Sequence, residues 1–173
     1  MPAGILLLPF LGVRFLLLSC LSGTALRRAA RFAPMQGAEK IAYIVYQLSN
    51  LGIFLLLIFS TVPLAPSWSL FLGLLCYLCG LALCAAAVIN FASPDRSGLN
   101  TAGLYRFSRN PMYVAYFVCF LGMALLARSL PVLGAVLVFQ VSAHWIILAE
   151  ERWCTTAFGS AYRHYMQRVR RYL

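Results

Sequence analysis

Acidic residues are nearly absent from this chain. Its 173 residues include only four Asp and Glu and two His, and charged residues make up 10% of the total. An average soluble domain is about one quarter charged, so this composition argues against an ordinary soluble fold. The sequence also lacks any Gly-x-Gly motif, which argues against a soluble dinucleotide-binding fold.

Hydrophobic residues, by contrast, make up 62% of the chain and occur in long blocks. Blocks of about 20 residues match the hydrocarbon thickness of a bilayer, and the alternation typical of a β-barrel is missing. The blocks predict helices at about residues 4–26, 41–64, 70–90 and 111–127, and a fifth that follows the turn at 128–131 and ends near 149. We therefore expect an all-α integral membrane protein of about five transmembrane helices, with a C-terminal cytoplasmic helical extension.

The formal net charge of +10 reflects membrane topology rather than nucleic-acid binding, because the chain has no contiguous soluble basic surface. Most of the basic residues gather in three segments: Arg27, Arg28, Arg31 and Lys40; Arg96, Arg106 and Arg109; and Arg152, Arg163, Arg168, Arg170 and Arg171. These segments alternate with the nearly uncharged connections 63–69 and 128–131. The positive-inside rule then predicts a multi-pass protein with its N-terminus outside and its C-terminus in the cytoplasm, and a prokaryotic inner membrane suits so compact a chain.

The first apolar block is expected to stay in the protein as a helix, because no positive charge precedes it and Arg14 interrupts it. The six cysteines lie mostly in apolar blocks, and packing explains the Cys76 and Cys79 pair better than metal or redox chemistry. We expect one membrane domain, 1–173, in which residues 1–90 form scaffold helices and residues 91–173 form the cofactor-binding and catalytic half.

The first candidate site segment precedes the fourth helix. Pro111 fixes the start of that helix, so nearby backbone N–H groups and the positive end of the helix dipole can receive an anion. Arg109 adds a forked donor suited to a carboxylate or phosphate, and Tyr113 and Tyr116 follow on the next turns. Anchoring at the membrane surface is the competing interpretation.

The second candidate segment is the fifth helix with its extension. Gln140, His144 and Glu151 have helical spacing, and Glu150 and Glu151 supply half of the chain's acids. Structural hydrogen bonding of His144 and simple ion pairing of the glutamates are the alternatives. The tail that follows contains tyrosines on one helical face and arginines on the others, a pattern also typical of a helix at the membrane surface.

Together these segments resemble the integral-membrane methyltransferase family that includes isoprenylcysteine carboxyl methyltransferase and phosphatidylethanolamine N-methyltransferase. The resemblance covers about residues 90–173 and depends on the order of several short motifs. These motifs are Gly103-Leu-Tyr105-Arg106, Arg109-Asn110-Pro111-Met-Tyr113, Glu150-Glu151, Phe158-Gly159-Ser-Ala-Tyr162-Arg-His-Tyr165 and Val169-Arg-Arg171.

This resemblance implies S-adenosylmethionine as methyl donor and a lipid-like or amphiphilic acceptor that arrives from the bilayer. It places the donor's amino-acid end at Arg109, Tyr113 and the helix start, and the adenine between tyrosines of the tail. In full, it implies cofactor contacts for Tyr105, Arg109, Asn110, Pro111, Tyr113, Glu150, Glu151, Tyr162 and Tyr165, and catalytic roles for Glu151 and Arg171. Membrane lipids are the expected partners, with no nucleic acid and no metal.

Two features of the motifs depart from the family pattern. Asn110 stands where the family usually has histidine, and no proline follows the arginine motif at the end of the tail. A membrane sterol or enone reductase that uses NADPH is one alternative, although such enzymes carry Phe-Gly-Glu where this chain has Val114-Ala115-Tyr116. A non-catalytic membrane scaffold is the other. A prenylated cysteine, a phospholipid amine and a small amphiphile all remain open as acceptors.

Overall fold

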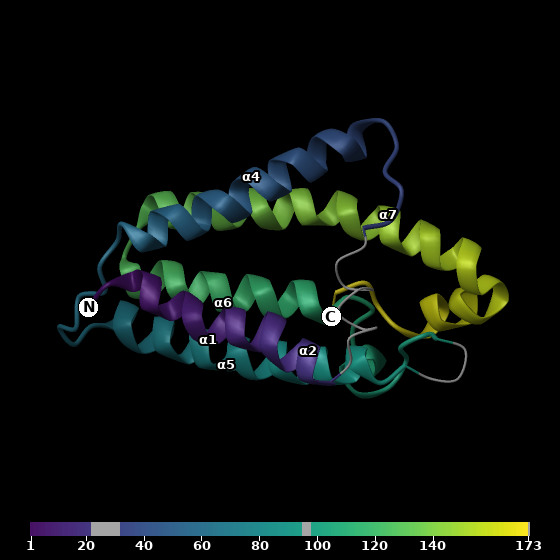
Figure 1. The fold of residues 1–173 in the computed structure, drawn as a ribbon, viewed down its shortest axis with the longest axis horizontal. Helices are drawn as coiled ribbons and strands as arrows, with labels where there is room; N and C mark the ends of the chain where they lie inside the picture. The colour runs from purple at the N-terminus through teal and green to yellow at the C-terminus, as the bar shows by residue number, and fades with distance from the viewer. Residues whose placement is uncertain (22–31, 95–97, 173) are drawn as a thin grey trace.

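The computed structural model describes residues 1–21, 32–94 and 98–172 of the chain, and within them it forms an elongated bundle of helices (Figure 1). The N-terminal helix consists of four consecutive elements: η1 (Ala3–Leu6), α1 (Leu7–Leu11), the π-helical η2 (Gly12–Leu17) and α2 (Leu18–Leu21). The elements that follow are α4 (Ala38–Ile58), α5 (Trp68–Ala92), the short η3 (Gly103–Arg106), α6 (Pro111–Ala127) and α7 (Leu130–Arg168).

Four of the described helices are long and apolar enough to cross a membrane, and α6 adds a fifth apolar helix of 17 residues. At 1.5 Å per residue α6 is about 25 Å long, near the lower limit for spanning a bilayer. The bundle exposes many large apolar side chains, including Leu48, Phe71 and Val141, which suits contact with lipid rather than water. Together these features confirm the predicted all-α membrane fold.

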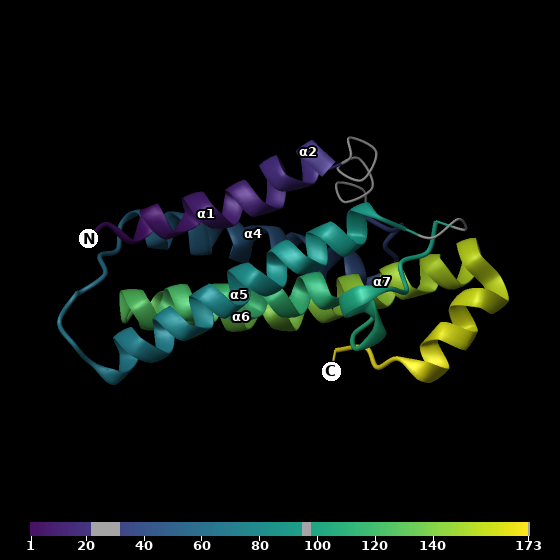
Figure 2. The ribbon, with the colours of Figure 1, turned by 90° about the horizontal axis from the view of Figure 1, so that it is seen from below.

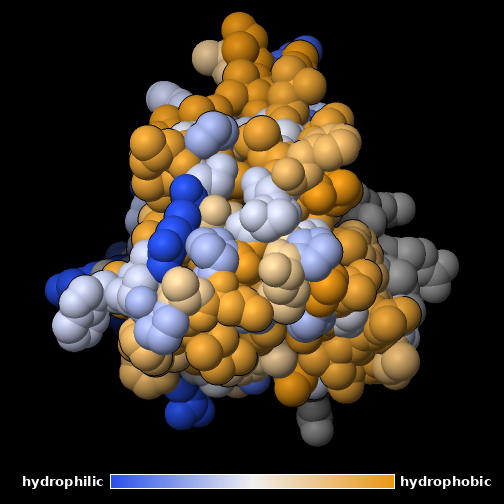
Figure 3. Space-filling view, turned by 90° about the vertical axis from the view of Figure 1, so that its left-hand side faces the viewer, coloured by the Kyte–Doolittle hydropathy of each residue, from blue (hydrophilic) through white to orange (hydrophobic). Residues whose placement is uncertain are grey.

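One end of the bundle holds the N-terminus, the α4–α5 connection and the α6–α7 turn (Figures 1 and 2). The N-terminal ammonium group of Met1 donates to the Val62 carbonyl at 3.1 Å, which fixes the start of the chain beside the α4–α5 connection. The surface of this end is mostly hydrophobic, with only small hydrophilic areas (Figure 3). The other end, called the loop end below, holds residues 98–110 and the C-terminal tail.

Close approach of α5 and α6 depends on glycine. A Cβ atom on Gly80 would collide with the backbone of Cys119, and one on Gly122 would collide with the backbone of Tyr77. Small residues at such positions let two membrane helices pack backbone against backbone, which strengthens their van der Waals attraction. Helix α6 is thereby held in the interior, with one end at the loop end of the bundle.

Helix α7 is much longer than a membrane span, at 39 residues, and bends sharply at Gly159. The backbone of Gly159 has φ 56° and ψ −126°, a conformation that residues with a Cβ rarely adopt. Beyond this bend the helix folds back toward the bundle, so that the tail returns to the start of α6 (Figure 1). The predicted helical extension is therefore present, and its direction is set by one glycine.

Helix boundaries otherwise follow the sequence pattern, with one clear difference. The second helix ends at Ile58 rather than near residue 64, because the chain then leaves the helix for the proline-rich connection to α5. The predicted end of the first helix, and the basic residues Arg27, Arg28, Arg31 and Arg96, lie outside the described residues.

Candidate functional site

A cavity of about 510 Å³ opens among the helices toward the loop end of the bundle. This volume lies within the range of about 300–1,000 Å³ that is typical of small-molecule sites. Its walls come from the N-terminal helix, α4, the segment before α6, and helices α6 and α7. The predicted site residues that line it are Tyr105, Arg109, Asn110, Tyr113, Glu150, Glu151, Tyr162 and Tyr165. Segments far apart in the sequence thus converge on one hollow.

Glu151 is the centre of the polar cluster on the cavity wall. Its Oε1 lies 3.3 Å from Arg109 Nη2, and its Oε2 accepts from Arg171 Nε at 3.1 Å and Nη2 at 2.9 Å. The residue is only 4% exposed, so these partners replace the water that a free carboxylate would need. With two arginines around one glutamate, the cluster retains one positive charge and favours an anion.

Asn110 uses both N–H bonds of its side-chain amide. Its Nδ2 donates to Glu151 Oε1 at 3.3 Å and to the Arg171 carbonyl at 3.2 Å. An amide donor does not depend on pH, so this hydrogen-bonding role needs no titrating group. The asparagine therefore joins the start of α6 to both α7 and the tail.

The tail closes one side of the cluster by pairing with the segment before α6. The backbone N–H of Arg109 donates to the Arg170 carbonyl at 2.9 Å, and the backbone N–H of Asn110 donates to Ser108 Oγ at 3.1 Å. These two N–H groups are already occupied, so the anion expected near Pro111 does not have them available. Arg171 itself lies beside the cavity, and its hydrogen bonds to Glu151 raise the pKa of its guanidinium.

Glu150 points to a different partner from its neighbour. Tyr113 donates its hydroxyl to Glu150 Oε1 at 3.0 Å, and the Tyr113 ring lies against those of Tyr46 and Tyr116 with centroids 6.5 and 6.4 Å away. Successive helical residues point about 100° apart, which explains how adjacent glutamates reach separate groups. The cavity thus has one acid held by arginines and one held by a phenol.

The tyrosines of the tail form a second, aromatic part of the wall. Tyr162 and Tyr165 are buried with Leu99, and Phe158 packs against them. Tyr165 donates its hydroxyl to the Tyr105 carbonyl at 2.6 Å, so its ring position is fixed by the segment before α6. This part of the cavity provides flat apolar surfaces of the kind that enclose an aromatic base.

Two polar atoms in the cavity wall are buried and have no hydrogen-bond partner within the described part of the chain. These atoms are Nε of Arg109 and Oδ1 of Asn100, one donor and one acceptor. Buried polar groups are nearly always paired, so an unpaired donor and acceptor on one cavity wall indicate a ligand that supplies the partners. The Arg109 side chain is only 8% exposed, which makes solvent an inadequate substitute.

Other predicted residues lie outside the cavity. Pro111 is buried at the start of α6, where it fixes the helix that carries Tyr113. Gln140 Oε1 is buried with no partner among the described residues, and His144 Nδ1 lies 2.6 Å from the Tyr172 hydroxyl. Of the three residues expected to form one polar face, Gln140, His144 and Glu151, only Glu151 lines the cavity.

Sequence reasoning missed several residues of the wall, among them Arg14, Tyr46 and Asn100. Arg14 offered a usable signal, because an ionisable residue inside an apolar helix is costly and is rarely placed there without a function. Tyr46 carries no such signal, since buried tyrosines are common in helix bundles. Asn100 is one polar residue among several in its segment.

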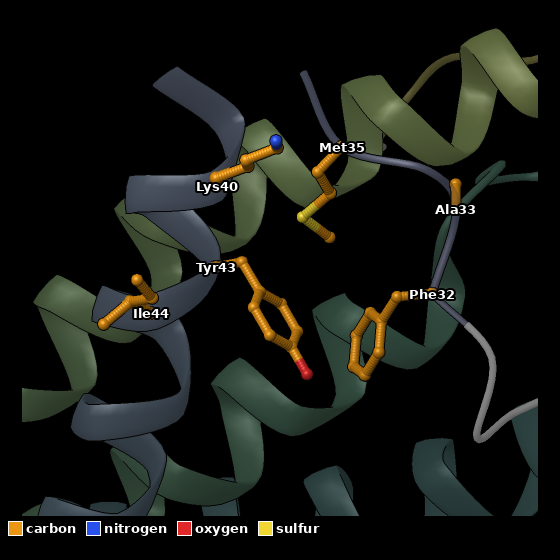
Figure 4. Close-up of a pocket in the computed structure, with 6 residues that line it drawn as sticks. All are labelled: Phe32, Ala33, Met35, Lys40, Tyr43 and Ile44. Atoms are coloured by element: carbon orange, nitrogen blue, oxygen red, sulfur yellow. The ribbon is translucent and has the colours of Figure 1, made fainter. Parts of the chain in front are cut away.

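A second, smaller hollow of about 320 Å³ lies next to the cavity at the start of α4 (Figure 4). Its walls consist of Phe32, Ala33, Met35, Lys40, Tyr43 and Ile44. The rings of Phe32 and Tyr43 lie 5.0 Å apart in an edge-to-face arrangement, and Phe32 and Ala33 also line the larger cavity. The two hollows therefore share two lining residues.

Comparison with protein-family models matches the chain to the phospholipid methyltransferase family over residues 68–161, which is more than half of the chain. The chain belongs to the phospholipid methyltransferase family. The match includes Arg109, Tyr113 and both glutamates, whereas the tyrosines of the tail and Arg171 lie beyond it. Searches of the curated proteins and of the solved structures return no match. Membership of this family identifies a membrane methyltransferase that acts on lipid-like substrates.

Proposed function

We propose that the protein transfers a methyl group from S-adenosylmethionine to a lipid-like or amphiphilic acceptor where the membrane meets the cytosol. The observation that carries the proposal is the cavity wall. It combines the arginine–glutamate cluster at Glu151 with the unpaired Nε of Arg109 and the aromatic surfaces of the tail. A charged nucleoside with a carboxylate at one end and an adenine at the other requires this combination.

The residues present suit the donor molecule part by part. Arg109 has Nη2 committed to Glu151 and Nε available, so it can bind the donor's carboxylate without giving up its ion pair. Glu150 and Glu151 would accept hydrogen bonds from the donor's ammonium or ribose hydroxyl groups. Tyr162 and Tyr165 would enclose the adenine, and Asn100 Oδ1 offers a further acceptor.

Bound S-adenosylmethionine would supply a methyl group on a positively charged sulfur. The work left to the protein is to hold donor and acceptor in line and to exclude water. The buried cluster would help to hold donor and acceptor in line, because Glu151 fixes Arg109 and Arg171 relative to each other. The rings of Tyr113 and Tyr116 also line the cavity, and Tyr116 is buried. Glu150 is the group best placed to accept a proton if the acceptor is an amine.

The proposed orientation places the loop end in the cytoplasm, where the donor is made, and the N-terminus on the opposite side. Exposed arginines at the loop end support this, among them Arg163, Arg168 and Arg170. The acceptor would then reach the cavity from the bilayer, which is consistent with the exposed apolar surface around the bundle.

The test is calorimetry on the detergent-solubilised protein with S-adenosylhomocysteine and NADPH in parallel. We expect one saturable site for S-adenosylhomocysteine and none for NADPH. Binding of NADPH alone would assign the protein to the reductase alternative. Binding of neither compound would favour a non-catalytic scaffold.

A further inference from the structure

Arg14 lies inside the N-terminal membrane helix, far in the sequence from the motifs that carry the proposed function. The helix spans Ala3–Leu21, so Arg14 is several residues from either end and surrounded by apolar sequence. It also lies within the π-helical segment Gly12–Leu17. Segments of this kind are rare and often mark functional sites, and a charged residue at membrane depth is costly without a partner.

The neighbours of Arg14 are aromatic rather than acidic. Its guanidinium carbon lies 4.7 Å from the centre of the Tyr116 ring and 5.6 Å from that of Phe15, and Tyr46 is a further phenol neighbour. Within the described part of the chain, no ion pair includes Arg14. Aromatic faces and phenols offset part of the desolvation of a cation, but they leave its charge uncompensated.

The described glutamates are already engaged elsewhere. Glu39 pairs with Arg152 on the surface, Glu151 pairs with two arginines, and Glu150 is held by Tyr113. Arg14 nevertheless lines the same cavity as Glu150 and Glu151. The counter-ion that Arg14 needs can therefore be supplied by a molecule that enters this cavity.

We propose that Arg14 binds an anionic group, a phosphate or a carboxylate, on the amphiphilic acceptor, and thereby selects acceptors that carry such a group. This rests on the proposed function and adds a specificity-determining residue that lies outside the family match at residues 68–161. The donor's carboxylate has its own partner in Arg109, at the loop end of the cavity, whereas Arg14 projects from a membrane-spanning helix, the side from which a lipid arrives. Arg14 contacts Tyr116, whereas Glu150 is bound by Tyr113, so the anion and the reacting atom would occupy different parts of the cavity.

The experiment is a titration of the full-length protein, in a neutral detergent, with dioctanoyl phosphatidic acid and with dioctanoylglycerol. The two probes share their acyl chains and differ in the phosphate. We expect the wild-type protein to bind the phosphate-bearing probe at least about tenfold more tightly, the size of one charged contact. Arg14→Gln should abolish this preference, and Arg14→Lys should keep part of it because the positive charge remains.

Arg163→Gln is the matched control, because it removes one exposed positive charge near the loop end and leaves the cavity unchanged. It should keep the full preference. Titrations with inorganic phosphate and with S-adenosylhomocysteine separate the possible sources of the anion. S-adenosylhomocysteine affinity should be the same in Arg14→Gln as in the wild type, and inorganic phosphate alone should bind weakly.

Several results would overturn the proposal. Equal binding of both probes by the wild-type protein, or a preference for the phosphate-bearing probe that Arg14→Gln keeps, would contradict it. A lower affinity of Arg14→Gln for S-adenosylhomocysteine would also contradict it. The first is measured on the wild-type protein, so misfolding of a variant does not prevent a decision. Failure of the wild type to bind S-adenosylhomocysteine would instead contradict the proposed function, and the two failures are thus distinguishable.

Discussion

Removing the carboxylate of Glu151 tests how the site is held together. In Glu151→Gln the amide keeps the shape of the side chain but brings an NH₂ group against Arg109 or Arg171. Arg109, whose side chain is 8% exposed, then loses the carboxylate partner that the structure shows for it. Breaking a buried ion pair by removing one partner costs about 3–5 kcal/mol.

The lower part of that range applies here, because the Arg171 side chain is 32% exposed and can turn toward solvent. We therefore expect a loss of about 3 kcal/mol in folding stability, which for a chain of this size corresponds to a melting temperature lower by about 6–12 °C. Without its carboxylate partner the Arg109 side chain is no longer fixed in the cavity wall. Affinity for S-adenosylhomocysteine should then fall at least about tenfold, the effect of one lost charged contact.

The assay combines thermal unfolding in detergent with calorimetric titration of S-adenosylhomocysteine well below the lowest melting temperature. Glu39→Gln is the matched control, since it also removes a glutamate paired with an arginine, but one whose Arg152 partner is 42% exposed. Exposed pairs contribute about 0–1 kcal/mol, so this variant should retain its affinity and most of its stability. Wild-type affinity in Glu151→Gln would refute the assignment of Glu151 to the site.

Three further results are expected. Asn110→Ala removes both side-chain hydrogen bonds that join α6 to α7 and the tail. It should reduce S-adenosylhomocysteine affinity by about threefold to tenfold in the same titration, and unchanged affinity would contradict the role given to the amide. Gly80→Ala should lower the melting temperature because its Cβ would collide with Cys119, whereas Gly52→Ala, which has open space, should leave the melting temperature equal or higher. A wild-type melting temperature in Gly80→Ala would argue against close packing of α5 and α6. Tyr165→Phe loses the hydrogen bond to the Tyr105 carbonyl and should cost about 1 kcal/mol in unfolding experiments while the ring still lines the cavity, so loss of all ligand binding would be unexpected.

Much of the fold could be predicted from the sequence, because each membrane helix is encoded locally. Long apolar blocks bounded by prolines and charges are sufficient to locate α5 and α6 closely. The bend of α7 is different. Gly159 was part of a motif in the sequence, but only the structure shows that its positive φ turns the tail back onto the start of α6.

The sequence pointed to residues that gather around the cavity, but it did not give their contacts. The motifs pointed to Arg109, Tyr113 and the paired glutamates, and the structure gathers all of them around one cavity. Which glutamate meets which partner depends on the rotation of α7 relative to α6, a tertiary feature that short motifs do not contain. For the same reason the sequence could not show that the tail occupies the backbone N–H of Arg109, while Ser108 occupies that of Asn110.

Transfer of label from methyl-labelled S-adenosylmethionine into a membrane lipid extract tests the account most directly. With the wild-type protein, label should appear in material that partitions into organic solvent, and Glu151→Gln should reduce its rate at least about tenfold at limiting donor. An absence of label with the wild-type protein, across extracts that contain anionic and neutral lipids, would contradict the account.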